Sequence, residues 1–544
     1  MTKKMLTLIL VLAGLLPARA QQQPDSTQVR KELPQLEIPE LTIVGKKAIT
    51  LPFARKGEIY DVTVYEAPPA DSSLLLERLQ PGIPVGSLPR YEQRQMPWRS
   101  SLEGSLGNYS TIGAGGYLDY SAEGWGVSGK GGYRRTGGHT ENSSGNTTLA
   151  GATIHSLLAT DNDVLRTLRA SFGTSWQHES YGLTGIVGPT AHRTRNNIII
   201  DGRLGSLNRQ GLILDVNLGA NIWKVSDELT PLDSSVSVVS PKVNASLGAD
   251  IGAGRLLGEF SYESSSLDYQ HPTESPSLLS VAGSVRWGIA NQVFLQAGGR
   301  YAGGSNSAGG SRSLVAPLAR LTWEIDEGRS ITFWFEPQMK FESYDDHVRL
   351  NPYIGRELVL QPERQVLNFG GSVWYNRGML SLEVKAAFTK SSGKSLTIAD
   401  SGRIRLEPAD VFQTIVGAEG TVRASDRTRI NFTGVLQPSF EDGSTTQLPM
   451  TPVLKLGAKG ELDVVRSVTL WASADYRSKE NIDRAGTRTL GDLVLVGAGA
   501  TASVFSHIVL SFDATNLLNS SYSWWEGYPA PGRTLSVGAK LRLE

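Results

Sequence analysis

Residues that could carry out chemistry are sparse in this chain, and their spacing matches no catalytic or metal-binding motif. The seven histidines include no His-Glu-x-x-His pair and no spacing typical of metal ligands. No Gly-x-Ser-x-Gly sequence is present to position a hydrolase nucleophile. The glycine clusters at 113–116 and 129–132 lack the Gly-x-Gly-x-x-Gly pattern of dinucleotide sites. We therefore expect no enzyme activity, no metal site and no cofactor.

The composition excludes several classes of protein. The 53 basic and 53 acidic residues give a net charge of zero, so we expect no nucleic acid partner held by bulk positive charge. The absence of cysteine excludes a disulfide-stapled scaffold. A hydrophobic content of 40% and a mean hydropathy of -0.19 exclude a bundle of membrane helices. The 59 glycines, with no break in composition after about residue 100, indicate one long glycine-rich body.

The first 20 residues have the features of a signal peptide, so we assign residues 1–20 to export. Lys3 and Lys4 precede an apolar run over residues 5–16, and Ala18 and Ala20 give the small-x-small pattern of a cleavage site. A buried N-terminal helix is the alternative interpretation. The apolar run is too short for a transmembrane helix.

Residues 21–98 are rich in proline and form a predicted periplasmic leader. Ten of the 26 prolines fall in this stretch, and proline removes a backbone donor and interrupts both helices and sheets. We expect an extended segment with a short strand over 41–44 and a short helix over 72–79.

From residue 99 to residue 544 the dominant pattern is strict alternation of apolar and polar residues, which is typical of β-strands. Clear examples are residues 331–341, 380–389, 468–477 and 534–543. One alternating segment would also suit a soluble sandwich. Each run, however, extends over about 10 residues, the length that a tilted strand needs to cross a ~30 Å hydrocarbon layer.

The lengths of the connections give an independent argument. We count 22 strand candidates, among them strands beginning near Ser100, Arg193, Val411 and Arg533. Their joints alternate between tight turns, such as 252–254, 326–328, 376–378 and 425–427, and long loops, such as 134–146, 344–363, 479–488 and 520–532. Outer-membrane barrels segregate their connections in this way. The predicted fold is all-β, a transmembrane antiparallel β-barrel of about 22 strands in contact with outer-membrane lipid.

Aromatic residues fit this architecture. All 11 tryptophans lie at or beyond Trp98, where interface girdles of a barrel use an apolar ring with a polar edge. Tyr522, Trp524, Trp525 and Tyr528 gather in the last long loop and are candidates for contact with a ligand. An interface girdle is the alternative role for these four.

The C-terminal residues resemble the end of a TonB-dependent receptor barrel. In that family an Asn-Leu-hydrophobic-Asn segment with a later Tyr ends the penultimate strand, and Pro-Gly-Arg opens the last one. The matching residues are Asn516, Leu517, Asn519, Tyr522, Pro531, Gly532 and Arg533. Residues 351–352 and 360–363 are similar to the mid-barrel loop of the family. The resemblance implies a bacterial outer-membrane receptor inserted by the barrel-assembly machinery.

The leader departs from the family pattern. Family members have a globular plug before the barrel, and residues 21–98 are too few for one, so we expect the plug to be reduced or missing. A 22-stranded barrel leaks unless it is filled, so the leader, a partner or the long loops must fill it. Leu41, Thr42, Ile43, Val44 and Gly45 resemble the TonB box, a strand that pairs with the energy-transducing protein TonB. A plain strand packed within the leader or lumen is the alternative.

These patterns leave three functional hypotheses. The first is energised uptake of a bulky nutrient, such as an iron chelate, a vitamin or a glycan fragment, as in TonB-dependent receptors. The second is a passive porin, and the third is a structural or assembly barrel whose lumen is filled by a partner protein. The substrate cannot be identified because specificity would reside in irregular loops.

Overall fold

The computed structural model describes residues 98–159, 167–185, 191–207, 211–228, 234–268, 275–307, 310–355, 358–400 and 403–543. All of them belong to one compact unit of the chain. The predicted signal peptide and the proline-rich leader, with its TonB-box-like residues Leu41, Thr42, Ile43, Val44 and Gly45, lie outside the described residues.

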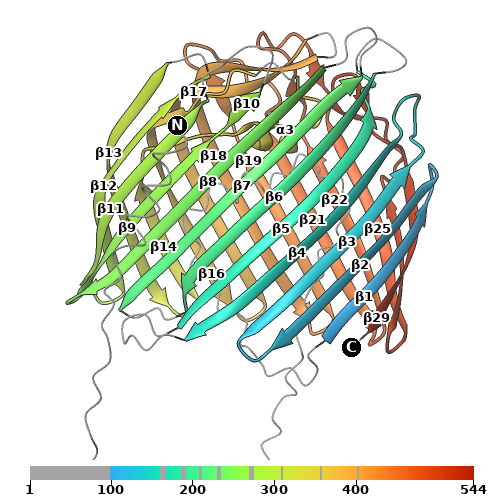
Figure 1. Ribbon diagram of the computed structural model, residues 1–544, viewed down its shortest axis with the longest axis horizontal. Helices are drawn as coiled ribbons and strands as arrows, with labels where there is room; N and C mark the ends of the chain where they lie inside the picture. The colour runs from blue at the N-terminus through green and yellow to red at the C-terminus, as the bar shows by residue number, and fades with distance from the viewer. Residues whose placement is uncertain are drawn as a thin grey trace, which may run out of the picture. The chain divides into compact units, whose positions relative to one another are not determined.

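The described residues form one antiparallel sheet that closes on itself as a 22-stranded barrel (Figure 1). The first half consists of β1 (Trp98–Gly107), β2 (Thr111–Ala122), β3 (Trp125–Thr136), β4 (Gly145–Ala159), β5 (Thr167–Gly182), β6 (His192–Ser206), β7 (Leu212–Glu228), β8 (Ser234–Ile251), β9 (Gly254–Ser264), β11 (Ser277–Ala290) and β12 (Val293–Ser305). The second half consists of β13 (Ser311–Asp326), β14 (Arg329–Phe335), β16 (Glu363–Arg377), β17 (Leu380–Asp400), β18 (Arg403–Ser425), β19 (Thr428–Leu436), β21 (Leu454–Val465), β22 (Val468–Arg477), β25 (Leu493–Phe505), β26 (Ile508–Thr515) and β29 (Thr534–Leu543). The predicted fold class is confirmed.

Short strands extend the sheet and form two small hairpins in the connections. β10 (Ser266–Asp268) follows β9 and pairs with β8. β15 (Gln338–Lys340) follows β14 and pairs with β16, and β20 (Ser439–Glu441) follows β19 and pairs with β18. Two small hairpins, β23 (Glu480–Asn481) with β24 (Thr489–Leu490) and β27 (Ser523–Trp525) with β28 (Tyr528–Pro529), lie in connections. Each barrel strand pairs with its neighbours in sequence. The pairing of β1 with β29, from Ser100↔Leu543 to Gly107↔Ser536, closes the ring.

The alternating pattern separates the outer and inner faces of the wall. On the closing pair, the exposed Leu106 of β1 lies opposite the exposed Val537 of β29. Glu103 of β1 lies opposite Lys540 of β29, at the positions of the other parity. An apolar outer face and a polar inner face, with every backbone group paired inside the closed sheet, are what a β-structure in lipid requires.

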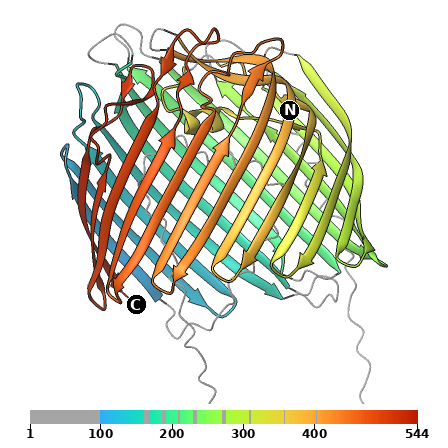
Figure 2. The ribbon, with the colours of Figure 1, turned by 180° about the vertical axis from the view of Figure 1, so that it is seen from behind.

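The connections are segregated by length, as predicted. The tight turns at 252–253, 327–328, 378–379 and 426–427 lie at one end of the barrel, which we call the turn end. The opposite end, called the loop end, carries the long connections and is uppermost in Figures 1 and 2. One strand is longer than predicted: β18 starts at Arg403 rather than near Val411. β17 and β18 form a hairpin that continues past a bulge at Ser391/Lys394, where Gly393 has a positive φ of 73°.

The only helix among the described residues is α3 (Tyr344–Leu350), in the connection between β15 and β16. Ser343 caps its start: the Ser343 hydroxyl accepts from the Asp346 amide at 3.4 Å, and the Asp346 carboxylate accepts from the Ser343 amide at 3.0 Å. The helix ends at Leu350, and its C-cap Asn351 has extended backbone because it stands immediately before Pro352, and proline disfavours helical backbone in the residue before it. No described helix is long and apolar enough to cross a membrane.

Candidate functional site

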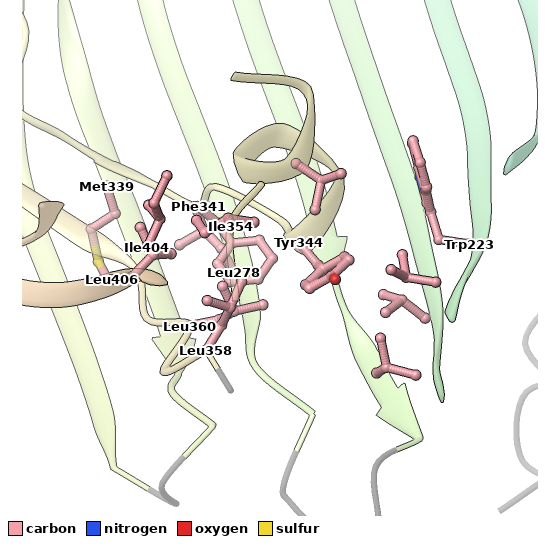
Figure 3. Close-up of a cluster of buried hydrophobic side chains, with 14 of the residues drawn as sticks. Trp223, Leu278, Met339, Phe341, Tyr344, Ile354, Leu358, Leu360, Ile404 and Leu406 are labelled. Atoms are coloured by element: carbon pink, nitrogen blue, oxygen red, sulfur yellow. The ribbon is translucent and has the colours of Figure 1, made fainter. Parts of the chain in front are cut away.

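The connection that contains α3 folds inside the barrel wall at the loop end. We call residues 341–355 and 358–362 the inner segment. Tyr344, Val348 and Ile354 of this segment are almost fully buried. Figure 3 shows α3 beside wall strands, with Tyr344 directed toward the side of Trp223. A lumen lined by polar residues does not bury such side chains, so this part of the lumen contains a packed core.

That core joins residues from many strands. Trp223 and Val225 of β7 and Val236 and Val238 of β8 are buried apolar residues at inward-facing positions, which is unusual for an inner wall. The other members come from β11, β12, β15, the inner segment, β18 and the last loop: Leu278, Ala302, Met339, Phe341, Tyr344, Val348, Ile354, Leu358, Leu360, Ile404, Leu406 and Tyr528. Burial of this apolar surface stabilises the inner segment against the wall.

The inner segment touches widely separated parts of the wall. Ile354 forms a parallel β-bridge with Ile404 of β18, and the Gly355 amide donates to the Ile404 carbonyl at 2.6 Å. Near β12, the Ser307 amide donates to the Leu360 carbonyl at 3.0 Å. The same segment reaches β6, the sixth of the 22 strands, whereas Ile404 lies in the part of the β17–β18 hairpin beyond the bulge at Ser391/Lys394. The inner segment, which begins after β15 and ends at β16, therefore extends from that side of the wall to β6 at the loop end.

One buried arginine fastens the inner segment to the wall. Arg193 of β6 is 2% exposed, and its Nε and Nη2 donate to the two carboxylate oxygens of Asp227 on β7 at 2.7 and 2.9 Å. Its Nη1 donates to the carbonyls of Pro352 and Ile354, both at 2.8 Å. The Tyr181 hydroxyl of β5 donates to the same Pro352 carbonyl at 2.6 Å. Charge-assisted hydrogen bonds of this kind are shorter and stronger than neutral ones.

Aromatic rings also pack in the region where Arg193 meets the inner segment, which we call the junction. Tyr353 stacks on Tyr528 of the last loop with ring centroids 3.7 Å apart, and Tyr181 meets Tyr353 edge-on at 5.7 Å. Burial raises the pKa of Tyr353 to about 12, so its phenol is neutral at physiological pH. The junction therefore combines one ion pair with three tyrosine rings from the wall, the inner segment and the last loop.

A buried carboxylate lies on α3. The Asp345 carboxylate accepts from Asn221 of β7 and from Arg349 one helical turn later, both at 2.6 Å. Burial raises the pKa of Asp345, and the nearby Arg349 guanidinium partly offsets that rise. The bond from Asn221 attaches the helix to the β7 wall, whereas the bond from Arg349 lies within the helix.

The four predicted ligand-contact residues divide into two pairs. Tyr528 is 3% exposed within the core, and Trp525 packs against that core. Tyr522 and Trp524 are half-buried and meet edge-on, with ring centroids 5.3 Å apart. The Arg477 guanidinium lies 4.9 Å from the Trp524 ring. Trp525 is also half-buried, so the second pair differs from the first in not being part of the core or packed against it.

The first half of the C-terminal motif forms a turn after β26. Asn516 has a φ of 48°, in the left-handed region that asparagine tolerates, and its side chain is buried. Its amide nitrogen donates to the Ser520 carbonyl at 2.9 Å and to the Pro531 carbonyl at 3.4 Å, and its amide oxygen accepts from the Ser520 amide at 2.9 Å. Asn516 therefore joins the start of the last loop to its end.

The second half of the motif also joins the start of the last loop to its end. Asn519 has a φ of 53°, and its side-chain oxygen accepts from the Arg533 amide at 2.9 Å. The Arg533 guanidinium donates to the Leu517 carbonyl at 2.9 Å. A Cβ at Gly532 would lie 2.7 Å from the Asn519 side-chain oxygen, so a larger residue there would force that side chain to move. In this conformation the motif residues hold the last loop in place beside the closing strand.

The sequence did not point to Arg193, Asp227 or the inner segment. The inward parity of Arg193 was readable from the alternation, but its acceptors lie 159 and 161 residues further along the chain. Such a contact follows only from closure of the barrel. Among the described residues, no group of three or more acidic or histidine side chains is placed to hold a metal ion.

Solved structures share this fold. The iron transporter FrpB of Neisseria meningitidis superposes with a TM-score of 0.65 at 11% identity, with 82% of each chain covered. The ferric yersiniabactin uptake receptor FyuA of Yersinia pestis gives a TM-score of 0.61 at 11% identity, over 83% of this chain and 81% of that one. The copper transporter OprC gives 0.63 at 10% identity, over 83% and 81%.

The sequence itself matches no known family model and no curated protein. The similarity to the solved structures is therefore one of fold. The barrel has the fold of TonB-dependent receptors, as the C-terminal residues predicted, and its apolar outer surface is that of a bacterial outer-membrane protein.

Proposed function

We propose that this protein is an outer-membrane receptor-like transporter that takes up a bulky nutrient through energised opening. The observation that carries the proposal is the packed core across the loop end of the lumen. A passive porin keeps an aqueous channel open through its barrel, whereas here the inner segment and its core occupy part of the lumen at the loop end. The receptor fold supports the same interpretation.

In the proposed cycle the loop end captures the solute and the inner segment then moves. Tyr522 and Trp524 are the candidate contacts, since they are the members of the aromatic set that do not belong to the core or pack against it. The energy would come from TonB pairing with Leu41–Gly45 and pulling on the leader. An iron chelate is the first substrate class to test because similar structures include an iron transporter and a ferric siderophore receptor. A vitamin and a glycan fragment are the substrate classes to test next.

Uptake measurements test the energised mechanism. Cells that express the full chain are compared with cells whose chain lacks residues 41–45, using radiolabelled ferric chelates, a cobalamin and oligosaccharides. We expect one class to accumulate, and accumulation to fall at least tenfold with the deletion or with a protonophore. A deletion of residues 26–30, in the same leader, is the matched control and should leave uptake unchanged.

The other two hypotheses give different results in the same experiment. Accumulation that neither the deletion nor the protonophore reduces would establish the passive porin and overturn our proposal. No accumulation of any class, together with a stoichiometric protein co-purifying with the barrel, would establish the structural or assembly role.

A further inference from the structure

We propose that Arg193 is the latch of this barrel: its guanidinium holds the inner segment across the loop end, and release of its bonds to Pro352 and Ile354 opens the lumen. The inference deepens the proposed function, because it names the residue that regulates passage. It rests on the position of Arg193 between the wall and the inner segment.

The bonding of Arg193 is suited to a latch. Two of its nitrogens form a fork on Asp227, which fixes the guanidinium to the wall. The third nitrogen bonds the inner segment through two backbone carbonyls, Pro352 and Ile354, rather than through side chains. One side chain therefore binds the moving part and the fixed part at the same time, and the two sets of bonds can break separately.

The remaining attachments at this junction are uncharged. The Pro352 carbonyl also accepts from the Tyr181 hydroxyl, and Tyr353 stacks on Tyr528. Loss of Arg193 would leave the Ile354 carbonyl without its buried donor, and a buried unpaired carbonyl favours a conformation in which water reaches it. The inner segment should then leave the wall more often, starting at 352–354.

The same two strands provide a matched control pair. Arg203 of β6 bonds Asp215 of β7 at 2.6 Å, ten positions nearer the turn end. Its side chain is 57% exposed, and its bond to Asp215 joins two wall strands and does not involve the inner segment. Truncation of Arg203 removes a guanidinium–carboxylate pair between the same strands while leaving the proposed latch intact.

Conductance of the purified full-length chain in planar lipid bilayers tests the latch. The wild type, Arg193→Ala, Arg193→Lys and Arg203→Ala are compared after each shows the heat-dependent gel mobility shift of a folded barrel. We expect Arg193→Ala to raise the fraction of time spent open at least tenfold over the wild type. Arg203→Ala should match the wild type. Arg193→Lys should lie between them, because an ammonium group cannot form the fork.

A reversible cross-link identifies the moving part. The chain has no cysteine, so Ile354→Cys with Ile404→Cys introduces the only pair, at two residues bridged in the structure. In the Arg193→Ala background, oxidation should abolish the openings and a reductant should restore them.

Three results would overturn the latch: a folded Arg193→Ala barrel as silent as the wild type, an Arg203→Ala barrel that opens equally, or openings that persist after cross-linking. These results are separate from the fate of the proposed function. Uptake that survives deletion of residues 41–45 would remove energised transport but would leave the conductance comparison valid.

Discussion

The buried carboxylate of Asp345 makes the stability of the inner segment depend on pH. Burial raises its pKa above the ordinary value near 3.9. The folded state then holds the proton more tightly than the unfolded segment does. Protonation of Asp345 therefore stabilises the attached helix at acidic pH, and this contribution is lost as the pH rises from about 4 to the raised pKa.

The direction of the pKa shift of Asp345 predicts how the stability of α3 changes with pH. We expect the opening free energy of the α3 amides, measured by hydrogen exchange and corrected for the intrinsic rate, to fall as the pH rises from about 4. Asp345→Asn should flatten that dependence, because an amide does not titrate in this range. Amides in the centre of β5 serve as the internal control. An unchanged slope in Asp345→Asn would assign the titration to another group.

At the scale of the element, the strands were predictable and the inner segment was not. Alternation is a local property, so the positions of Leu106 and Val537 in the pattern indicate the outer face of their strands without knowledge of the neighbouring strands. The hairpin of β17 and β18 extends further than predicted because its alternating pattern continues after the bulge at Gly393. The inner segment is defined by contacts with strands remote in sequence, which no local pattern records.

Adjacent positions on β7 test the assignment of faces. Leu218 is 53% exposed at an outward position six residues after Leu212, and Asn217 belongs to the inward parity. Leu218→Lys should destabilise the barrel in lipid vesicles by about 2–4 kcal/mol, whereas Asn217→Lys should cost less than about 1 kcal/mol. Urea unfolding followed by tryptophan fluorescence measures both. Equal destabilisation by the two substitutions would contradict the inward and outward assignment.

At the scale of the whole barrel, the sequence showed that something must fill the lumen. A 22-stranded barrel is too wide to close by its own wall residues, and the leader, a partner and the long loops were all open possibilities. Among the described residues, the inner segment and the last loop supply a packed core at the loop end. The C-terminal motif has a part in this arrangement, because Asn516 and Arg533 hold the loop that carries Tyr528.

The central claim is that the inner segment is the permeability barrier of the barrel. The most direct test is the bilayer conductance of the full chain before and after residues 343–355 are replaced by a glycine-serine linker of equal length. The wild type should be silent, and the replaced barrel should show a large, steady conductance. A wild-type barrel that conducts steadily, or a folded replacement variant that stays silent, would contradict the claim.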